Sequence, residues 1–330
     1  MAEVSVTTVS HVLNETRRVS DDAKARVQQA VRALGYVPSA VARSLKHRST
    51  RTLGMLVPNS SNPYFAEIIK SVERQCYAEG YNLVLCNSED DTERQADHLR
   101  MLAERRIDGL VLVASGEDAH VSEALAELRL PVVLVDREID GVADADLVEA
   151  DHASGGELAT RHLLELGHER IVCIGGPEAL RPSLQREAGW RRALAAAGVA
   201  AGRADLIRGD FTPQGGYAAL HRLLDRKRRP SALFVCNDMM AIGALHAAHE
   251  AGIAVPRQLS VVGFDDIDLA AYTMPPLTTV AQPKDAIGTG TTKLLLERIR
   301  GTRSKARRLI LQPELRVRSS SAPPAGKRGA

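Results

Sequence analysis

The sequence predicts an α/β protein in which a small all-α head precedes a core of two lobes, each built on a doubly wound parallel sheet. From Arg51 onward, short apolar runs alternate with longer helical stretches, which is typical of repeated βα units with helices on both sheet faces. The pattern breaks near Asp151, which indicates two lobes with a cleft between them. The first 50 residues instead place their apolar side chains at helical spacing.

The run Ser5–Asn14 is expected to form the first helix of the head. Its apolar residues lie at helical spacing and should face a core: Val9, Val12 and Leu13. The side chains left to face outward are short or hydrogen-bonding: Ser5, Val6, Thr7, Ser10, His11 and Asn14. Such a face fits the DNA major groove, because short side chains let a helix approach the base edges.

A second helix is expected after Ser20, which should cap it, and it should end at Gly35. Its apolar face comprises Ala23, Val27, Ala30, Val31 and Leu34. The next segment, Tyr36–Lys46, is rich in alanine and has a proline near its start, and an isolated helix of this length is marginal in water. Taken alone, this segment reads as a linker helix with Leu45 packed on a neighbour.

The head is basic, whereas the remainder of the chain is mildly acidic. Residues 1–51 hold nine Lys and Arg against four Asp and Glu, a net charge of +5, although the whole chain carries only +2. A basic head indicates a polyanionic partner such as nucleic acid. On charge alone, a solvated basic helix surface is an equal alternative.

Strands and helices of the core follow from the apolar pattern. The predicted strands are Leu53–Val57, Leu83–Cys86, Gly109–Val113, Val132–Val135, Ile171–Ile174, Ala232–Cys236 and Ser260–Val262. The predicted helices are Tyr64–Glu79, Glu93–Arg105, Gly155–Leu166, Leu184–Ala197, Pro213–Leu224 and Met239–Ala251. Residues 319–330 are rich in Ser, Pro, Ala, Lys and Arg and are predicted to be a disordered tail.

Composition excludes several classes of protein. The hydrophobic content of 44% is ordinary for a globular protein of 330 residues. No apolar run approaches the length that spans a membrane, and the first residues do not begin a signal peptide, so we expect a cytoplasmic protein with no membrane partner. The cysteines lack metal-ligand spacing and should be reduced, buried thiols: Cys76, Cys86, Cys173 and Cys236.

The sequence does not predict an enzyme. It contains neither a phosphate-binding G-x-x-x-x-G-K-[ST] motif nor a G-x-S-x-G nucleophile elbow. Gly288–Thr291 is glycine-rich but does not open a βαβ unit, so it is interpreted as a packing feature. His246 and His249 could touch one metal ion, but no carboxylate is placed to complete the site. We therefore expect no catalytic residue, no metal and no cofactor.

Polar or aromatic residues follow several predicted strands, which is where ligands bind in open α/β sheets. Carboxylates, amides and guanidinium groups can pair with adjacent hydroxyls, and aromatic rings can cover the C–H faces of a sugar ring. Singly, each signal is weak, since Asn and Asp after a strand are more often turn or capping residues. The candidate ligand-binding residues are Asn62, Tyr64, Phe65, Asp136, Arg137, Arg186, Phe211, Asn237, Asp265 and Gln282.

The head resembles the recognition helix of the lactose/galactose-repressor family, whose pattern V-S-x-x-T-V-S-x-V-L-N matches Val4–Asn14. The resemblance implies an operator-DNA partner. It implies contacts to base edges from Val6, Thr7 and His11. It implies phosphate contacts, or support of the helix, from Ser5, Thr8, Ser10 and Asn14. Further non-specific positive charge would come from Arg17, Lys24 and Arg26.

Tyr36–Lys46 resembles the hinge helix of the same family, which implies that Leu45 inserts into the minor groove with Lys46 beside it on the DNA. Family members carry roughly ten further residues before the position of Val4, most of the first helix of their helix-turn-helix. The head is therefore expected to be an incomplete helix-turn-helix. On this basis, weak or no DNA binding is expected of the chain as written.

The order of the cleft residues resembles that of periplasmic ribose-binding proteins and of the effector domains of ribose operon repressors. All ten candidates match ribose contacts of that group, although an Asn after the third strand is here Ala114 or Ser115. Purine repressors are also similar, but their purine-reading Arg and Thr align with Leu180 and Pro182. The resemblance, which extends from Val4 to about Arg316, implies ribose or another pentose as the effector and makes a purine less favoured.

Together these resemblances imply a homodimeric transcriptional repressor that ribose releases from its operator. The expected domains are an incomplete head (1–36), a hinge and linker (37–50), and a periplasmic-binding-protein-like core (51–318). One lobe would comprise 51–150 with 283–311, and the other 151–282 with 312–318. The alternatives are a purine-responsive repressor, or a sugar-binding protein without DNA-binding activity because its head is truncated.

Overall fold

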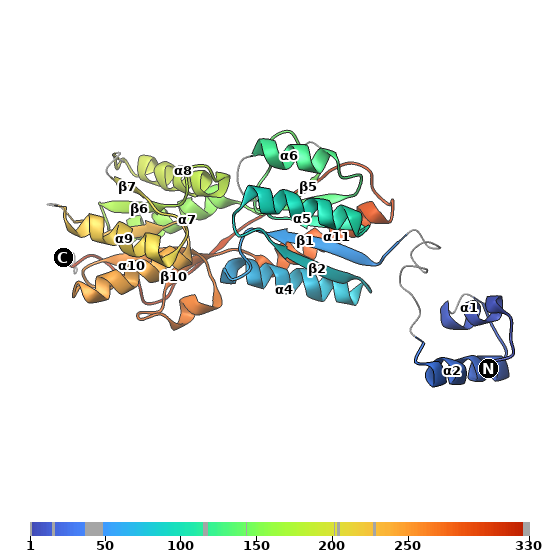
Figure 1. Ribbon diagram of the computed structural model, residues 1–330. Helices are drawn as coiled ribbons and strands as arrows, with labels where there is room; N and C mark the ends of the chain where they lie inside the picture. The colour runs from blue at the N-terminus through green and yellow to red at the C-terminus, as the bar shows by residue number, and fades with distance from the viewer. Residues whose placement is uncertain are drawn as a thin grey trace. The chain divides into compact units, whose positions relative to one another are not determined.

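The computed structural model describes residues 2–14, 17–36, 49–114, 118–142, 144–200, 202, 205–226 and 229–325. The chain forms two compact units, Met1–Arg51 and Thr52–Ala330 (Figure 1). The candidate minor-groove residues Leu45 and Lys46 lie outside the described residues.

The first unit contains two helices, α1 (Val6–Asn14) and α2 (Asp21–Leu34). Ser5 caps α1, because its Oγ accepts a hydrogen bond of 3.1 Å from the backbone N–H of Thr8. Ser20 occupies the N-cap position of α2, but its side chain makes no capping hydrogen bond. Gly35 ends α2 in the left-handed conformation, with φ of +56°. Both predicted helices are therefore present.

The apolar face of α2 is only partly buried. Ala23 and Val27 are buried, whereas Leu34 leaves 61% of its surface exposed. On α1, all three predicted core residues are half-buried: Val9, Val12 and Leu13.

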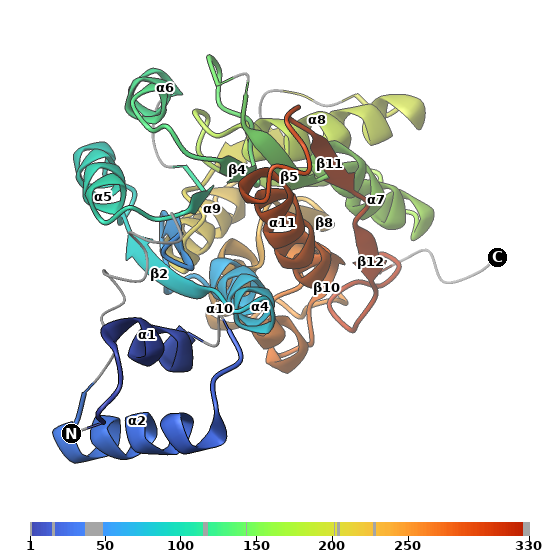
Figure 2. The same ribbon diagram turned by 90° about the vertical axis from the view of Figure 1, so that its right-hand side faces the viewer.

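The first lobe of the core has a six-stranded sheet in the order β11-β5-β4-β3-β1-β2, and all of its strand pairs are parallel. Its strands are β1 (Thr52–Val57), β2 (Asn82–Asn87), β3 (Gly109–Leu112), β4 (Val132–Val135), β5 (Asp146–Ala150) and β11 (Arg308–Leu311). Its helices are α4 (Pro63–Ala78), α5 (Thr92–Glu104), α6 (Asp118–Ala126) and α11 (Lys284–Ile299). Figure 2 shows α4 and α11 side by side on one face of the sheet and α5 and α6 on the other.

The second lobe repeats this plan with the strand order β12-β10-β9-β8-β6-β7, in which only the short β12 is antiparallel to its neighbour. Its strands are β6 (Ile171–Gly175), β7 (Leu206–Arg208), β8 (Ala232–Val235), β9 (Ser260–Asp265), β10 (Thr278–Ala281) and β12 (Glu314–Arg316). Its helices pack as two pairs: α7 (His152–Glu165) with α8 (Arg181–Ala196), and α9 (Pro213–Leu224) with α10 (Asp238–Glu250). A short 3-10 helix, η2 (Asp268–Tyr272), follows β9.

The chain crosses between the lobes three times: between β5 and α7, between β10 and α11, and between β11 and β12. Three crossings make each lobe discontinuous in sequence. The predicted α/β fold with two doubly wound parallel sheets is confirmed, and all seven predicted strands and six predicted helices are present.

Two glycines allow α7 and α8 to pack closely. A Cβ atom on Gly156 would come within 3.0 Å of the backbone carbonyl oxygen of Arg186, and one on Gly189 would come equally close to the carbonyl of Ala153. Because no side chain separates the two helices here, the backbone of Arg186 lies directly against α7. Gly288 has a similar role in α11, where a Cβ would meet Ser71 of α4, so the glycine-rich segment is a packing feature, as predicted.

The prediction of disorder from Ser319 is wrong for residues 319–322. Ser320 is fully buried, and its Oγ donates to the carbonyl of Val261 and accepts from the N–H of Thr278. The carbonyl of Ala322 accepts hydrogen bonds from His168 and Ser260. A serine-rich segment is disordered only when its polar groups find no hydrogen-bonding partners in the fold. Here the second lobe supplies several such groups.

Candidate functional site

A cavity of about 420 Å³ lies between the lobes, at the carboxyl ends of strands from both sheets. Nine of the ten candidate ligand-binding residues line it: Asn62, Tyr64, Phe65, Asp136, Arg137, Arg186, Phe211, Asn237 and Asp265. The tenth candidate, Gln282, does not line this cavity. The fold therefore brings together side chains that are up to 203 positions apart, from Asn62 to Asp265.

Two of these residues are also helix caps. Asn62 accepts a hydrogen bond of 3.1 Å from the N–H of Tyr64 at the start of α4, and Asn237 accepts one of 2.9 Å from Met240 at the start of α10. The amide nitrogen of Asn237 also donates to the carbonyl of Phe211. The capping interpretation of these asparagines is thus correct, and their caps also hold them at the cavity wall.

Four residues that line the cavity have backbones in a sparsely populated conformation. Asp90, Asp136, Phe211 and Asp265 have φ angles of +58°, +73°, +66° and +116°, which residues other than glycine rarely adopt. Strain of this kind persists only where the surrounding structure imposes it, and it concentrates at functional sites. Its presence at four positions around one cavity supports a functional role for that cavity.

A closed ring of polar contacts connects the two lobes beneath the cavity. The Tyr64 hydroxyl of the first lobe lies 2.8 Å from Asp136 Oδ1 and 3.0 Å from Gln282 Oε1. Gln282 then donates through Nε2 to Asp265 Oδ1, at 2.8 Å, in the second lobe. Gln282 therefore supports two cavity residues rather than forming part of the cavity wall.

The second half of the ring passes through Arg186 and His152. Arg186 Nη1 lies 3.4 Å from Asp265 Oδ1, and its Nε donates to His152 Nδ1 at 3.3 Å. His152 Nε2 in turn lies 3.2 Å from the carbonyl oxygen of Asp136 and 3.4 Å from its Oδ1. His152 is a residue that the sequence analysis missed, although it directly follows the break at Asp151.

The two carboxylates of the ring have different electrostatic environments. Burial would raise the pKa of Asp136, but the hydrogen bond from His152, together with the positive charge of Arg186, outweighs burial and holds the pKa at about 2. Burial raises the pKa of Asp265 to about 6, although Arg186 and Gln282 act in the opposite direction. Asp136 is thus ionised throughout the physiological range, whereas Asp265 titrates just below neutral pH.

Aromatic and aliphatic side chains form much of the wall: Pro58, Phe65, Val113, Ala114, Pro177, Ala179, Leu180, Pro182 and Phe211. The charged residues of the wall are four aspartates and two arginines: Asp90, Asp136, Asp210, Asp265, Arg137 and Arg186. An excess of carboxylates disfavours an anionic ligand. Paired carboxylates and guanidinium groups beside aromatic rings suit a neutral ligand with several hydroxyls.

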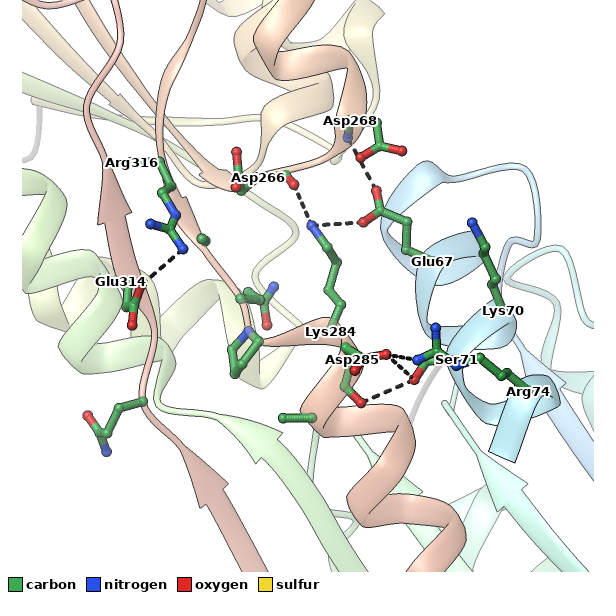
Figure 3. Close-up of a pocket in the computed structure, with 15 residues that line it drawn as sticks. Glu67, Lys70, Ser71, Arg74, Asp266, Asp268, Lys284, Asp285, Glu314 and Arg316 are labelled. Carbon is green, nitrogen blue, oxygen red and sulfur yellow. Dashed lines mark hydrogen bonds and ion pairs between the residues drawn. The ribbon is translucent and has the colours of Figure 1, made fainter. Parts of the chain in front are cut away.

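A second cavity of about 680 Å³ lies along two of the three chain crossings (Figure 3). Lys284 is its central residue, because Nζ donates to the backbone carbonyls of Asp265 and Asp266 and pairs with Glu67 Oε2 of α4 at 3.1 Å. Gln282 lines this cavity, and Arg74 pairs with Asp285 across it. The charges here largely pair with one another, so this region connects the strained Asp265 loop to the first lobe.

In the head, the candidate DNA-binding residues that the structure describes lie on α1 or at its N-cap, Ser5. Val6 is 87% exposed and Thr7 is also exposed, whereas Ser10 and His11 are half-buried. Ser5 and Thr8 bond to each other through their hydroxyls at 2.9 Å, in line with support of the helix start. Asn14 is the last residue of α1.

Two features of the described residues bear on other classes of protein. No helix in the described ranges is both long enough and apolar enough to cross a membrane. The same residues contain no group of three or more His, Cys, Asp or Glu placed to hold a metal ion. All four cysteines are buried and none forms a disulfide, as predicted.

Comparisons with known proteins agree with this architecture. Residues 1–39 match the family "Bacterial regulatory proteins, lacI family", and residues 160–321 match "Periplasmic binding protein-like domain". The chain is 43% identical over 322 residues to the transcriptional repressor PurR of Edwardsiella ictaluri, covering 97% of this chain and 94% of that protein. It is 41% identical over 323 residues to the ribose operon repressor of Escherichia coli K12, covering 97% of each.

Among solved structures, the lac repressor dimer bound to operator and the anti-inducer ONPF superposes with a TM-score of 0.88. The two proteins are 27% identical over 97% of this chain and 96% of that one. The similar curated proteins are repressors and not enzymes. This chain therefore belongs to the lacI family of bacterial regulatory proteins and is a transcriptional repressor.

Proposed function

We propose that this repressor binds ribose, or a closely related pentose, in the cavity between the lobes and that the sugar controls its affinity for operator DNA. One observation carries the proposal: two buried carboxylates, Asp136 of the first lobe and Asp265 of the second, line one cavity together with two arginines and two phenylalanines. A carboxylate accepts hydrogen bonds from two neighbouring hydroxyls, and phenylalanine rings cover the C–H faces of a furanose or pyranose.

The cavity wall favours a sugar over a purine. Overall identity does not separate the two, because the purine and ribose repressors are 43% and 41% identical to this chain. Leu180 and Pro182 line the cavity at the positions where purine repressors, by resemblance, carry purine-reading Arg and Thr. Neither side chain can donate a hydrogen bond, so a purine edge buried there would lose its partners.

We further propose that the protein acts as a homodimer, whose two heads read the two half-sites of a near-palindromic operator. The exposed Val6 and Thr7 of α1, with His11, are the proposed base-reading residues. Ribose would close the lobes, alter the relation between the two first lobes of the dimer and so release the operator.

Calorimetric titration of the full chain with ribose, xylose, hypoxanthine, guanine and ribose 5-phosphate tests the effector assignment. Ribose should bind more tightly than any of the others, and ribose 5-phosphate should bind poorly because its phosphate would meet an excess of aspartates. Asp265→Ala should weaken ribose binding strongly, because it leaves hydroxyls without partners at about 1–3 kcal/mol each. Tighter binding of hypoxanthine or guanine than of ribose would overturn the assignment.

A further inference from the structure

We infer that His152 is a positioning residue of the effector site: it carries its single ring proton on Nε2 and thereby orients Asp136 and Arg186, from opposite lobes, toward one ligand. The inference concerns the geometry of the protein. Only its consequence for ribose rests on the proposed function.

His152 is the first residue of α7, at the point where the chain crosses from β5 of the first lobe to the second lobe. Its side chain is fully buried, and it does not line the cavity. Asp151, the N-cap residue, accepts a hydrogen bond of 2.9 Å from the N–H of Ser154, which fixes the start of α7. The backbone of His152 is thus held in place independently of any ligand.

The partners of the imidazole ring determine its tautomer. Both atoms facing Nε2 are oxygens of Asp136, the carbonyl at 3.2 Å and Oδ1 at 3.4 Å, and both are acceptors. Both atoms facing Nδ1 are nitrogens of Arg186, Nε and Nη2 at 3.3 Å each, and a guanidinium can only donate. Only the neutral ring with hydrogen on Nε2 satisfies all four contacts, since the other tautomer would oppose every one of them.

His152 therefore joins two charged cavity residues that do not contact each other directly. Arg186 is oriented by three further groups: the carbonyl of Cys236 at 2.5 Å from Nη1, Asp265 Oδ1 at 3.4 Å, and the ring of Phe264 at 3.9 Å. These three belong to the second lobe. His152 is the contact through which the position of Arg186 is matched to that of Asp136 in the first lobe.

Several charged groups face His152 from the elements packed around it: Asp136 after β4, Glu149 on β5, and Arg186 on α8. Among these groups, Asp136 has a pKa that depends directly on the histidine. The hydrogen bond from His152 is the largest influence that lowers the pKa of Asp136 against the effect of burial. Removing the imidazole should therefore raise the pKa of Asp136. As the pH is lowered, Asp136 would then be protonated sooner, and the affinity for the sugar should fall more steeply than in the wild type.

Three substitutions of His152 distinguish its hydrogen bond to Asp136 from its hydrogen bond with Arg186. His152→Phe keeps an aromatic ring but removes both hydrogen bonds, and it should raise the Kd for ribose by about tenfold to a hundredfold. His152→Gln places an amide near the position of Nε2, where it can donate to Asp136, and His152→Asn places one near Nδ1, where it can accept from Arg186. Each should recover part of the affinity that phenylalanine loses.

The matched control is His246→Phe, the same change at an exposed position on α10 (63% side-chain exposure). It should leave the Kd unchanged. Measured between pH 7.5 and 4.5, the Kd of His152→Phe should rise more steeply on acidification than that of the wild type. A Kd for ribose in His152→Phe equal to that of the control at every pH would overturn the inference.

A ligand-free measurement keeps this inference distinct from the effector assignment. Nitrogen-15 NMR of the full chain labelled at histidine, with the signal of His152 identified by its loss in His152→Phe, should show a bare Nδ1 and a protonated Nε2 in the absence of sugar. If the wild type fails to bind ribose, the effector assignment fails while this signature still stands. A protonated Nδ1 would refute the role of His152 whatever the ligand.

Discussion

Asp265 combines burial, backbone strain and a raised pKa at one residue. It is 3% exposed, has a φ of +116°, and has a pKa that burial raises to about 6. Both oxygens of its carboxyl group act purely as acceptors only when the group is ionised, because a protonated carboxyl donates through one of them. Burial strengthens the hydrogen bonds of this carboxylate, but it also raises the free-energy cost of ionising it.

This combination predicts that the affinity for ribose depends on pH. Between pH 7.5 and 5, the carboxyl of Asp265 takes up a proton, so the Kd for ribose should rise by about tenfold, as expected one unit below a pKa of about 6. Titration calorimetry at several pH values measures this change. In Asp265→Asn, the Kd should be higher at pH 7.5 and nearly constant over that range. A flat pH profile in the wild type would contradict the assignment of Asp265.

Asp265 should have the opposite effect on the stability of the protein, which it lowers as the pH rises, whereas ribose affinity increases with pH. Because its folded-state pKa lies above the ordinary value of 3.8, Asp265 costs no stability below pH 3.8, and its cost grows as the pH rises to about 6. Asp265→Asn should therefore unfold at a higher temperature than the wild type at pH 7.5, in spite of its weaker binding. Such opposition is common where a strained, charged group serves function.

At the scale of elements, the strands with apolar sequences were predictable and the polar ones were not. β1, β3, β4 and β8 are continuous apolar runs because helices cover both of their faces. β5 contains Asp146, which is fully buried and paired with Arg303, 157 positions away. β7, β10, β11, β12, α6 and α11 were also missed, and most are short or are positioned by partners distant in sequence.

The same distinction applies to the site. Residues that cap a helix or follow a strand, such as Asn62 and Asn237, carry a local signal that the sequence reveals. His152 and Lys284 carry none, because their roles come from contacts between segments that only the fold brings together. Gln282 was predicted to bind the ligand, but it does not line the cavity, and its contacts are to Tyr64 and Asp265 beneath it.

The contact between α7 and α8 gives a prediction at this scale. Gly189→Ala would place a methyl group against the backbone of Ala153 and separate the helices near Arg186. Overpacking of this kind should lower the free energy of unfolding by about 1–3 kcal/mol, and it should also weaken ribose binding. Urea unfolding measures the first effect and calorimetry the second.

Gly290→Ala is the matched control, because its methyl group would meet side chains of the first lobe and no backbone: the flexible end of Leu309, and Val148 at an ordinary contact distance of 3.8 Å. It should cost less stability than Gly189→Ala and leave the Kd for ribose unchanged. Equal effects of the two substitutions on ribose binding would argue against a specific role for the α7–α8 contact.

At the scale of the whole core, the cavity is placed so that one ligand can contact both lobes at once. Three chain crossings and the ring of contacts through Tyr64, Gln282 and His152 connect the lobes already without a ligand. A ligand bound to Asp136 and Asp265 together would add contacts on both sides of the cavity. A ligand shifts the balance between open and closed forms only by its additional affinity for the closed one.

Ribose should therefore make the wild-type protein more compact, which small-angle X-ray scattering measures as a smaller radius of gyration. Asp136→Asn retains the second-lobe carboxylate but weakens the first-lobe contact, so saturating ribose should still bind and should compact the protein less. A non-binding polyol such as sorbitol, at the same concentration, controls for solvent effects. If Asp136→Asn, saturated with ribose, became as compact as the wild type, contacts to the second lobe alone would suffice for closure, and coupling to the head would have to arise elsewhere than across this cavity.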